Sequence, residues 1–107
     1  GLAIAIAYAM LDKTDPLLNA TRIVEGYHGV LPLGDDELAV VFPMACGRLA
    51  VSACLAAVQQ RQRPGDPYLS VSQQPIHRTM QRLLNVQPRF AETAFRHACS
   101  RTEPREG

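Results

Sequence analysis

A chain of 107 residues is long enough for one domain, and a hydrophobic content of 47% is sufficient for a buried core. The formal net charge of +1 argues against a polyanionic partner such as nucleic acid. No uninterrupted apolar segment reaches the ~20 residues of a membrane-spanning helix, so we expect no membrane partner.

The three cysteines predict small buried thiols. Cys46 and Cys54 lie eight residues apart in one predicted helix. That spacing is about 12 Å along a helix axis, which is too far for a disulfide bond. No histidine stands at ligand spacing from a cysteine. We therefore expect a reduced, cytoplasmic protein without a metal site.

The first two predicted elements are helices. Residues 2–11 are apolar without interruption, and their Ala, Leu and Met content favours a helix over a strand. Asp15-Pro16 predicts a second start, with Asp15 as N-cap and the proline in the first turn. Gly29 and Pro32 should end this helix.

The longest apolar stretch of the chain predicts its central helix. A start at Gly34 places three acidic residues in a first turn, where the helix dipole favours them. Pro43 should kink or split the continuation near Phe42. Residues 44–58 follow with only Arg48 and Ser52 breaking the apolar run, so we expect a helix over 44–62 that its neighbours cover on most sides.

The C-terminal third is expected to form a loop and two helices. Two prolines and a glycine in residues 63–71 predict a loop. Ser72 should cap the next helix, Asn85 should end it in a left-handed conformation, and Pro88 should open the last helix. The predicted buried face of that helix is Phe90, Ala91, Ala94, Phe95 and Ala98.

Together these elements predict an all-α fold, a five- or six-helix bundle. We expect one helical domain over residues 1–99, followed by a polar tail over 100–107. Eight arginines in residues 61–107 make the C-terminal part basic. They do not alternate with an aromatic platform, so we interpret them as a solvated face and not as a nucleic-acid interface.

The sequence offers three candidate substrate-binding residues, Tyr8, His28 and Arg48. Arg48 is surrounded in sequence by apolar residues, and a buried guanidinium needs an anionic partner. The favoured interpretation is a structural ion pair with an acid such as Asp12, Asp15 or Glu25. The alternative places Arg48 in a cleft, where it would bind a substrate carboxylate or phosphate.

His28 and the remaining motifs point to no catalytic chemistry. His28 ends the second predicted helix, where it would satisfy free carbonyl groups. No phosphate-binding loop or nucleophile elbow occurs in the sequence. The consecutive acids Asp35, Asp36 and Glu37 could suggest metal ligation, but they would point in different directions from a helix, so we interpret them as favoured by the helix dipole. We therefore predict no catalytic, cofactor-binding or metal-binding residue in this chain.

Six segments, read in order, carry a resemblance to a known family. The chain resembles the C-terminal end of the aminoglycoside phosphotransferase and choline kinase-like family from residue 1 to about 99. The hydroxylysine kinase-like branch is the most similar, including kinase domains fused to class III aminotransferases. The segments are Leu-Ala-Ile-Ala-Ile-Ala-Tyr-Ala-Met-Leu at 2–11, Gly-Tyr-His at 26–28, Pro-Leu-x-x-x-Glu-Leu at 32–38, Arg-Leu-Ala-Val-Ser at 48–52, Asp-Pro-Tyr-Leu-x-Val-Ser at 66–72 and Pro-Arg-Phe-Ala-Glu at 88–92.

The resemblance implies part of an ATP-dependent small-molecule phosphotransferase with a protein-kinase-like fold. In that family a catalytic His-Gly-Asp loop and an Asp-Phe-Gly-Asp metal motif precede the segment that residues 2–11 match. His28-Gly29-Val30 only mimics the first motif, because it lacks the aspartate. The implied function is an acceptor-side helical fragment that does not catalyse alone. ATP and Mg²⁺ are implied for the intact domain only, and the implied partners are a preceding kinase portion and a small-molecule acceptor.

A free-standing helical interaction or dimerisation module is the alternative function. The segment 2–11 is apolar on all faces, and a small bundle can cover only some of them. We therefore expect this segment to recruit a second copy of the chain.

Overall fold

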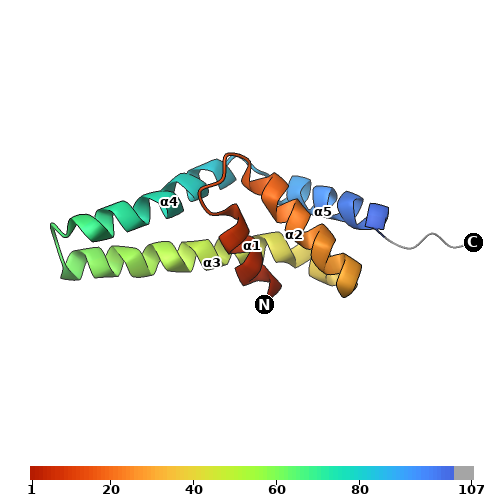
Figure 1. The fold of residues 1–107 in the computed structure, drawn as a ribbon, viewed down its shortest axis with the longest axis horizontal. Helices are drawn as coiled ribbons and strands as arrows, with labels where there is room; N and C mark the ends of the chain where they lie inside the picture. Colours follow the sequence, from red (N-terminus) through yellow and green to blue (C-terminus); the bar gives the residue numbers. More distant parts are fainter. Residues whose placement is uncertain (103–107) are drawn as a thin grey trace, which may run out of the picture.

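Five helices and no strands make up residues 1–102, the range that the structure, a computed structural model, describes. They are α1 (Leu2–Met10), α2 (Pro16–Val30), α3 (Asp35–Gln62), α4 (Pro67–Leu83) and α5 (Pro88–Thr102). The fold is elongated, 63 × 23 × 18 Å, with α3 along its length (Figure 1). The predicted all-α class is confirmed.

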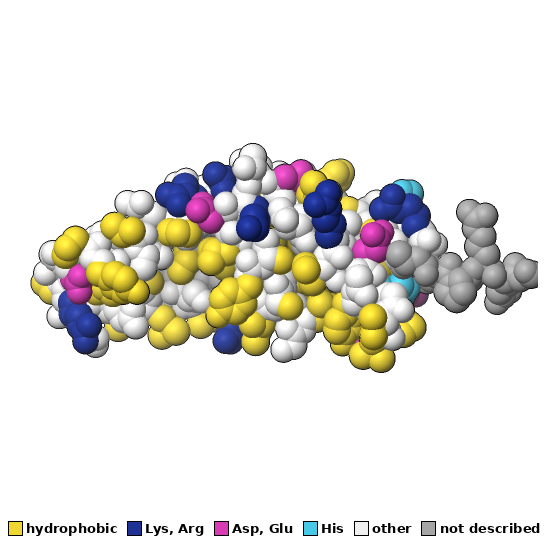
Figure 2. All heavy atoms as spheres, in the orientation of Figure 1, with side chains coloured by type: hydrophobic (Ala, Val, Ile, Leu, Met, Phe, Trp, Pro, Cys, Tyr) yellow, Lys and Arg dark blue, Asp and Glu magenta, His cyan; other side chains and the backbone are white. Residues whose placement is uncertain are grey.

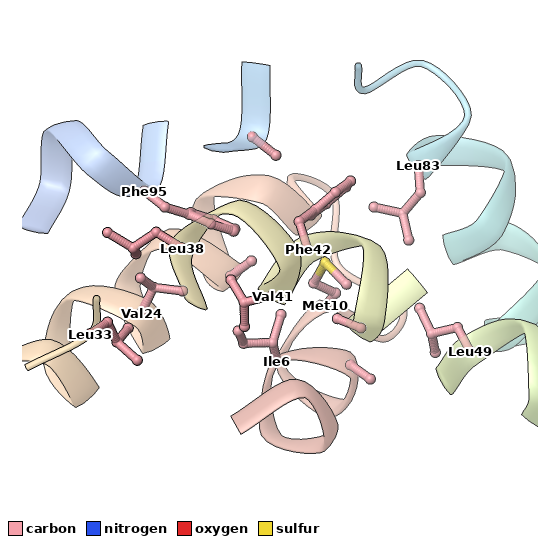
Figure 3. Close-up of a cluster of buried hydrophobic side chains, with 14 of the residues drawn as sticks. Ile6, Met10, Val24, Leu33, Leu38, Val41, Phe42, Leu49, Leu83 and Phe95 are labelled. Atoms are coloured by element: carbon pink, nitrogen blue, oxygen red, sulfur yellow. The ribbon is translucent and has the colours of Figure 1, made fainter. Parts of the chain in front are cut away.

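The hydrophobic core lies around the first half of α3. Figure 3 shows side chains from α1, α2 and α5 converging on Val41 and Phe42 of this helix. The rings of Phe42 and Phe95 pack edge to face, with centroids 6.2 Å apart. The core therefore fixes α1, α2 and α5 against one end of α3.

The second half of α3 is much less covered than the sequence predicted. Leu49 is its last buried residue, and none of residues 50–62 is buried. In Figure 1 this half runs beside α4, away from the other helices. The expectation that neighbours cover the apolar run on most sides is wrong beyond Leu49, because only α4 extends that far.

Of the two outcomes expected at Pro43, a kink or a split, the split does not occur. The helix runs from Asp35 to Gln62 with Pro43 in its interior. A proline removes one backbone hydrogen bond. Phe42 and Ala45 on either side are buried in the core, so packing holds both flanking turns in place.

The resulting 28-residue helix is long and apolar enough to cross a membrane by length and composition. The central helix of a water-soluble protein meets the same criteria, so this finding alone assigns no location.

Aspartate-proline pairs start two helices. The Asp15 carboxylate accepts a hydrogen bond from the Leu18 N–H, as predicted. Asp66 does the same for the Tyr68 N–H, so α4 begins at Pro67 and not at Ser72. The loop predicted for residues 63–71 is therefore wrong after Asp66, because Pro67 occupies a first turn and does not break the helix.

The C-terminal helix also differs from expectation in detail. It begins at Pro88, as predicted, but continues to Thr102, so the first residues of the predicted tail are helical. Residues 103–107 of that tail lie outside the described range. Phe90 was expected to be buried and is 64% exposed. Asn85 is not left-handed, since Asp12 is the one non-glycine residue with positive φ in the described range.

Several arginines form ion pairs with acids that are distant in the sequence. The Arg78 guanidinium donates two hydrogen bonds to the Asp12 carboxylate, at 2.9 and 3.1 Å, and so holds its pKa below the usual value. Arg96 binds Asp35, and Arg101 binds Glu25. These ion pairs are largely exposed, so they add geometric definition more than stability.

Candidate functional site

Arg48 lies on the exposed side of α3, where two hollows of the surface meet. The larger is an open groove of about 550 Å³ between α3 and the N-terminal end of α1. The smaller has a volume of about 220 Å³ and lies between α1, α3 and α4. Arg48 is the one residue that lines both, so its guanidinium can reach a molecule in either.

The smaller hollow combines a cation with two hydroxyl groups. Tyr8 comes from α1, Arg48 and Ser52 come from α3, and apolar side chains complete the lining. No acidic residue lines it. A guanidinium binds a carboxylate or phosphate through two parallel hydrogen bonds, and a hydroxyl can donate or accept. The arrangement therefore suits a small molecule that carries an anionic group.

The favoured interpretation of Arg48, a structural ion pair, is wrong. The side chain is exposed and forms no salt bridge with an acid in the described range. Asp12 binds Arg78, Glu25 binds Arg101, and Asp15 caps α2. The error arose because the apolar neighbours of Arg48 in sequence are themselves partly exposed.

Tyr8 and Arg48 are brought together, whereas His28 is not. Tyr8 is 73% exposed and lines the smaller hollow with Arg48. His28 is 6% exposed and lines neither hollow. Its Nδ1 accepts a hydrogen bond from the Leu33 N–H at 2.8 Å. The bond that the structure shows joins the end of α2 to the turn before α3, and it differs from the expected capping of carbonyl groups.

Sequence reasoning missed Ser52 and Ile76 as lining residues of the smaller hollow. Ser52 could have been found. Arg48 and Ser52 are the two polar breaks in the apolar run, and they lie four residues apart, which places them on one face of a helix. Ile76 could not have been found from sequence, because its position depends on how α4 folds back along α3.

The larger groove is mainly apolar. Leu2 and Ile4 from α1 face Val40, Met44 and Val51 from α3 across it. Figure 2 shows hydrophobic side chains along the lower edge of the view, where α1 and α3 lie, and most basic side chains along the upper edge. The chain thus presents an apolar face and an opposite, mostly basic edge.

Within residues 1–102, no group of three or more His, Cys, Asp or Glu side chains could hold a metal ion. The three acids at the start of α3 remain exposed in its first turn.

The chain is similar to one kinase. It is 27% identical to mouse (Mus musculus) hydroxylysine kinase over 92 residues, which are 85% of this chain and 24% of that protein. The chain thus spans about a quarter of the length of this relative. No protein-family model matches it. No solved structure matches it either.

Proposed function

We propose that this chain is the C-terminal, acceptor-side helical part of an ATP-dependent small-molecule kinase. The observation that carries the proposal is the similarity to hydroxylysine kinase, which runs through 85% of this chain but only 24% of that enzyme. A match of this extent is expected if the chain corresponds to one structural part of a larger catalytic protein.

In this proposal, the chemistry of phosphoryl transfer takes place in the preceding kinase portion and not in this chain. Transfer requires a group that positions the acceptor hydroxyl and carboxylates that hold Mg²⁺. In the family that the chain resembles, the catalytic and metal motifs precede the segment that residues 2–11 match, so we assign the transfer step to that part. The role left to this chain is to bind and orient the acceptor. We accordingly expect no ATP binding by the 107-residue chain.

The smaller hollow is the proposed acceptor site. Hydroxylysine, the compound in the relative's name, carries a carboxylate that matches the guanidinium of Arg48. The hydroxyls of Tyr8 and Ser52 would complete the polar contacts.

A titration of the isotope-labelled chain with hydroxylysine, followed by NMR, tests this assignment. Backbone shifts should change around Tyr8, Arg48 and Ser52, and ATP should change none. Loss of a charge-assisted hydrogen bond is worth about 1.5–3 kcal/mol, so Arg48→Ala should weaken binding roughly tenfold or more. Arg48→Lys should bind with intermediate affinity, since lysine keeps the charge but loses the planar fork.

Arg63→Ala is the matched control, because Arg63 is an exposed arginine that lines neither hollow. It should bind hydroxylysine like the unchanged chain. Equal affinity in the Arg48→Ala variant would contradict the acceptor site. Micromolar ATP binding by the chain would contradict the proposal that this chain binds only the acceptor and that ATP binds elsewhere in the kinase.

A further inference from the structure

Five large apolar side chains are exposed in one line along α3. Val40, Met44, Val51, Leu55 and Val58 are 48–61% exposed. Gly47 and Cys54 lie in the same line and are also exposed. From Val40 to Val58 the line advances by alternating steps of four and three residues, with Leu55 beside it, as in the contact face of paired helices. We call residues 40, 44, 47, 51, 54, 55 and 58 the α3 stripe.

The α3 stripe is nearly symmetric about the level of Leu49. Gly47 and Val51 lie two residues on either side of that level, Met44 and Cys54 five, and Val40 and Val58 nine. A two-fold axis at this level would place the two members of each pair opposite each other in an antiparallel pair of α3 helices. A surface that fits itself under a two-fold axis is the requirement for an isologous dimer.

The charges at the two ends of the α3 stripe are complementary under the same axis. Glu37 precedes Val40 and Arg61 follows Val58, each twelve residues from Leu49 and each exposed. Within one chain they are about 36 Å apart along the helix, which is too far for an ion pair. In an antiparallel dimer each Glu37 would face Arg61 of the other copy at both ends of the contact.

The larger groove also fits this partner. It is lined by the first half of the α3 stripe and by the N-terminal end of α1, whereas the second half of the α3 stripe extends beyond α1. Two-fold symmetry would lay the second half of each stripe into the groove of the other copy. Gly47 leaves open space at its backbone, with nothing within 4 Å of an added Cβ, so Val51 of the partner could approach closely.

We propose that the chain forms an antiparallel homodimer through the α3 stripe, with its two-fold axis at the level of Leu49. This proposal does not depend on the kinase assignment. It moves the expected dimer contact from segment 2–11 to α3, with the start of α1 as its border.

One charged residue opposes this contact. Arg48 lies one residue from the two-fold level, so the two copies of Arg48 would lie near each other at one edge of the dimer. Arg48→Ala should therefore leave the dimer intact or tighten it. Loss of the dimer in this variant would contradict the antiparallel register.

Analytical ultracentrifugation at several concentrations tests the interface. The unchanged chain should sediment as a dimer, and Val51→Asp should raise its dissociation constant at least about tenfold, as expected for a central contact residue. Val71→Asp is the matched control. Val71 is 64% exposed, two residues before Gln73, whose side chain bonds to the Ala56 carbonyl of α3, so it points away from α3. It should leave the dimer unchanged, and circular dichroism should show both variants folded.

Mild oxidation tests the register. In the proposed dimer Met44→Cys would lie opposite Cys54 of the other copy, so this variant should form a covalent dimer on a non-reducing gel. The unchanged chain should not, because its two Cys54 residues would be about 15 Å apart along the axis. The double variant Met44→Cys, Cys54→Ser should also fail to cross-link.

Three further results would overturn the proposal. The first is a monomeric chain at all concentrations, including one that instead binds phospholipid vesicles through the α3 stripe. The second is cross-linking of the unchanged chain through Cys54, which would indicate parallel pairing. The third is failure of Met44→Cys to cross-link. None of these bears on hydroxylysine binding, since Val51 and Met44 do not line the smaller hollow.

Discussion

Individual side chains in this chain separate into those that hold the fold together and those that face solvent. Arg48 was selected from sequence as a candidate binding residue, and it does line both hollows, but the favoured reason for selecting it, a structural ion pair, was wrong. A polar residue in an apolar run can be buried and paired or can lie on an exposed apolar surface. Only the arrangement of α1, α3 and α4 distinguishes the two, and it places Arg48 at the surface.

His28 should affect stability without affecting acceptor binding. His28→Ala removes the acceptor of the buried Leu33 N–H. An unsatisfied buried donor lowers the free energy of unfolding by about 1–3 kcal/mol. His28→Asn should recover part of that loss, because its side-chain oxygen can take the place of Nδ1. Urea denaturation measures the difference. A normal stability of the alanine variant would show that this hydrogen bond is unimportant.

Asp12 should make stability depend on pH. Its carboxylate binds Arg78, so its pKa is lower in the folded chain than in the unfolded chain. The stabilisation is therefore complete above the unfolded pKa, about 4, and is lost as pH falls through the folded pKa. Asp12→Asn removes this term but tolerates the left-handed backbone, φ 56°.

The melting temperature is measured as a function of pH for the unchanged chain and for the Asp12→Asn variant. The unchanged chain should melt higher than Asp12→Asn near neutral pH, and the difference should shrink below pH 4. A difference that stays constant down to pH 2 would show that the ion pair does not contribute.

At the level of the helices, the start of a helix was predicted correctly where an N-cap residue or a first-turn proline marks it. Asp15-Pro16 and Pro88 each marked a start that the structure confirms. Asp66-Pro67 carried the same signal, but the surrounding proline and glycine favoured a loop. The split considered at Pro43 does not occur for a different reason, since core packing on both sides of this proline compensates for one missing backbone hydrogen bond.

Gly26 should be a site where α2 can be strengthened. It lies inside this helix, is exposed, and has nothing within 4 Å of an added Cβ. Alanine favours a helix interior by about 0.8–1 kcal/mol over glycine, so Gly26→Ala should stabilise the chain by up to that amount. Thermal and urea denaturation check the change. A destabilised variant would mean that this face of α2 contacts something that the monomer does not contain.

The overall shape of the molecule was the property that the sequence predicted least well. Apolar periodicity shows that a helix has a hydrophobic face, but not which part of it a neighbour covers. A chain with α3 buried throughout would be compact, whereas the structure extends 63 Å because α4 alone follows the second half of α3. The larger groove and the α3 stripe both follow from this shape.

For the molecule as a whole, we propose that the chain supplies the acceptor side of a kinase. The most direct test is to measure the steady-state kinetics of phosphoryl transfer to hydroxylysine. The measurement uses the protein encoded by the complete coding sequence, with and without the Arg48→Ala substitution. We predict transfer from Mg-ATP to hydroxylysine. In the variant the acceptor KM should rise roughly tenfold or more with kcat largely retained, because a binding contact is lost while the catalytic groups stay in place. Absence of transfer to hydroxylysine, or an unchanged KM in the variant, would contradict the account.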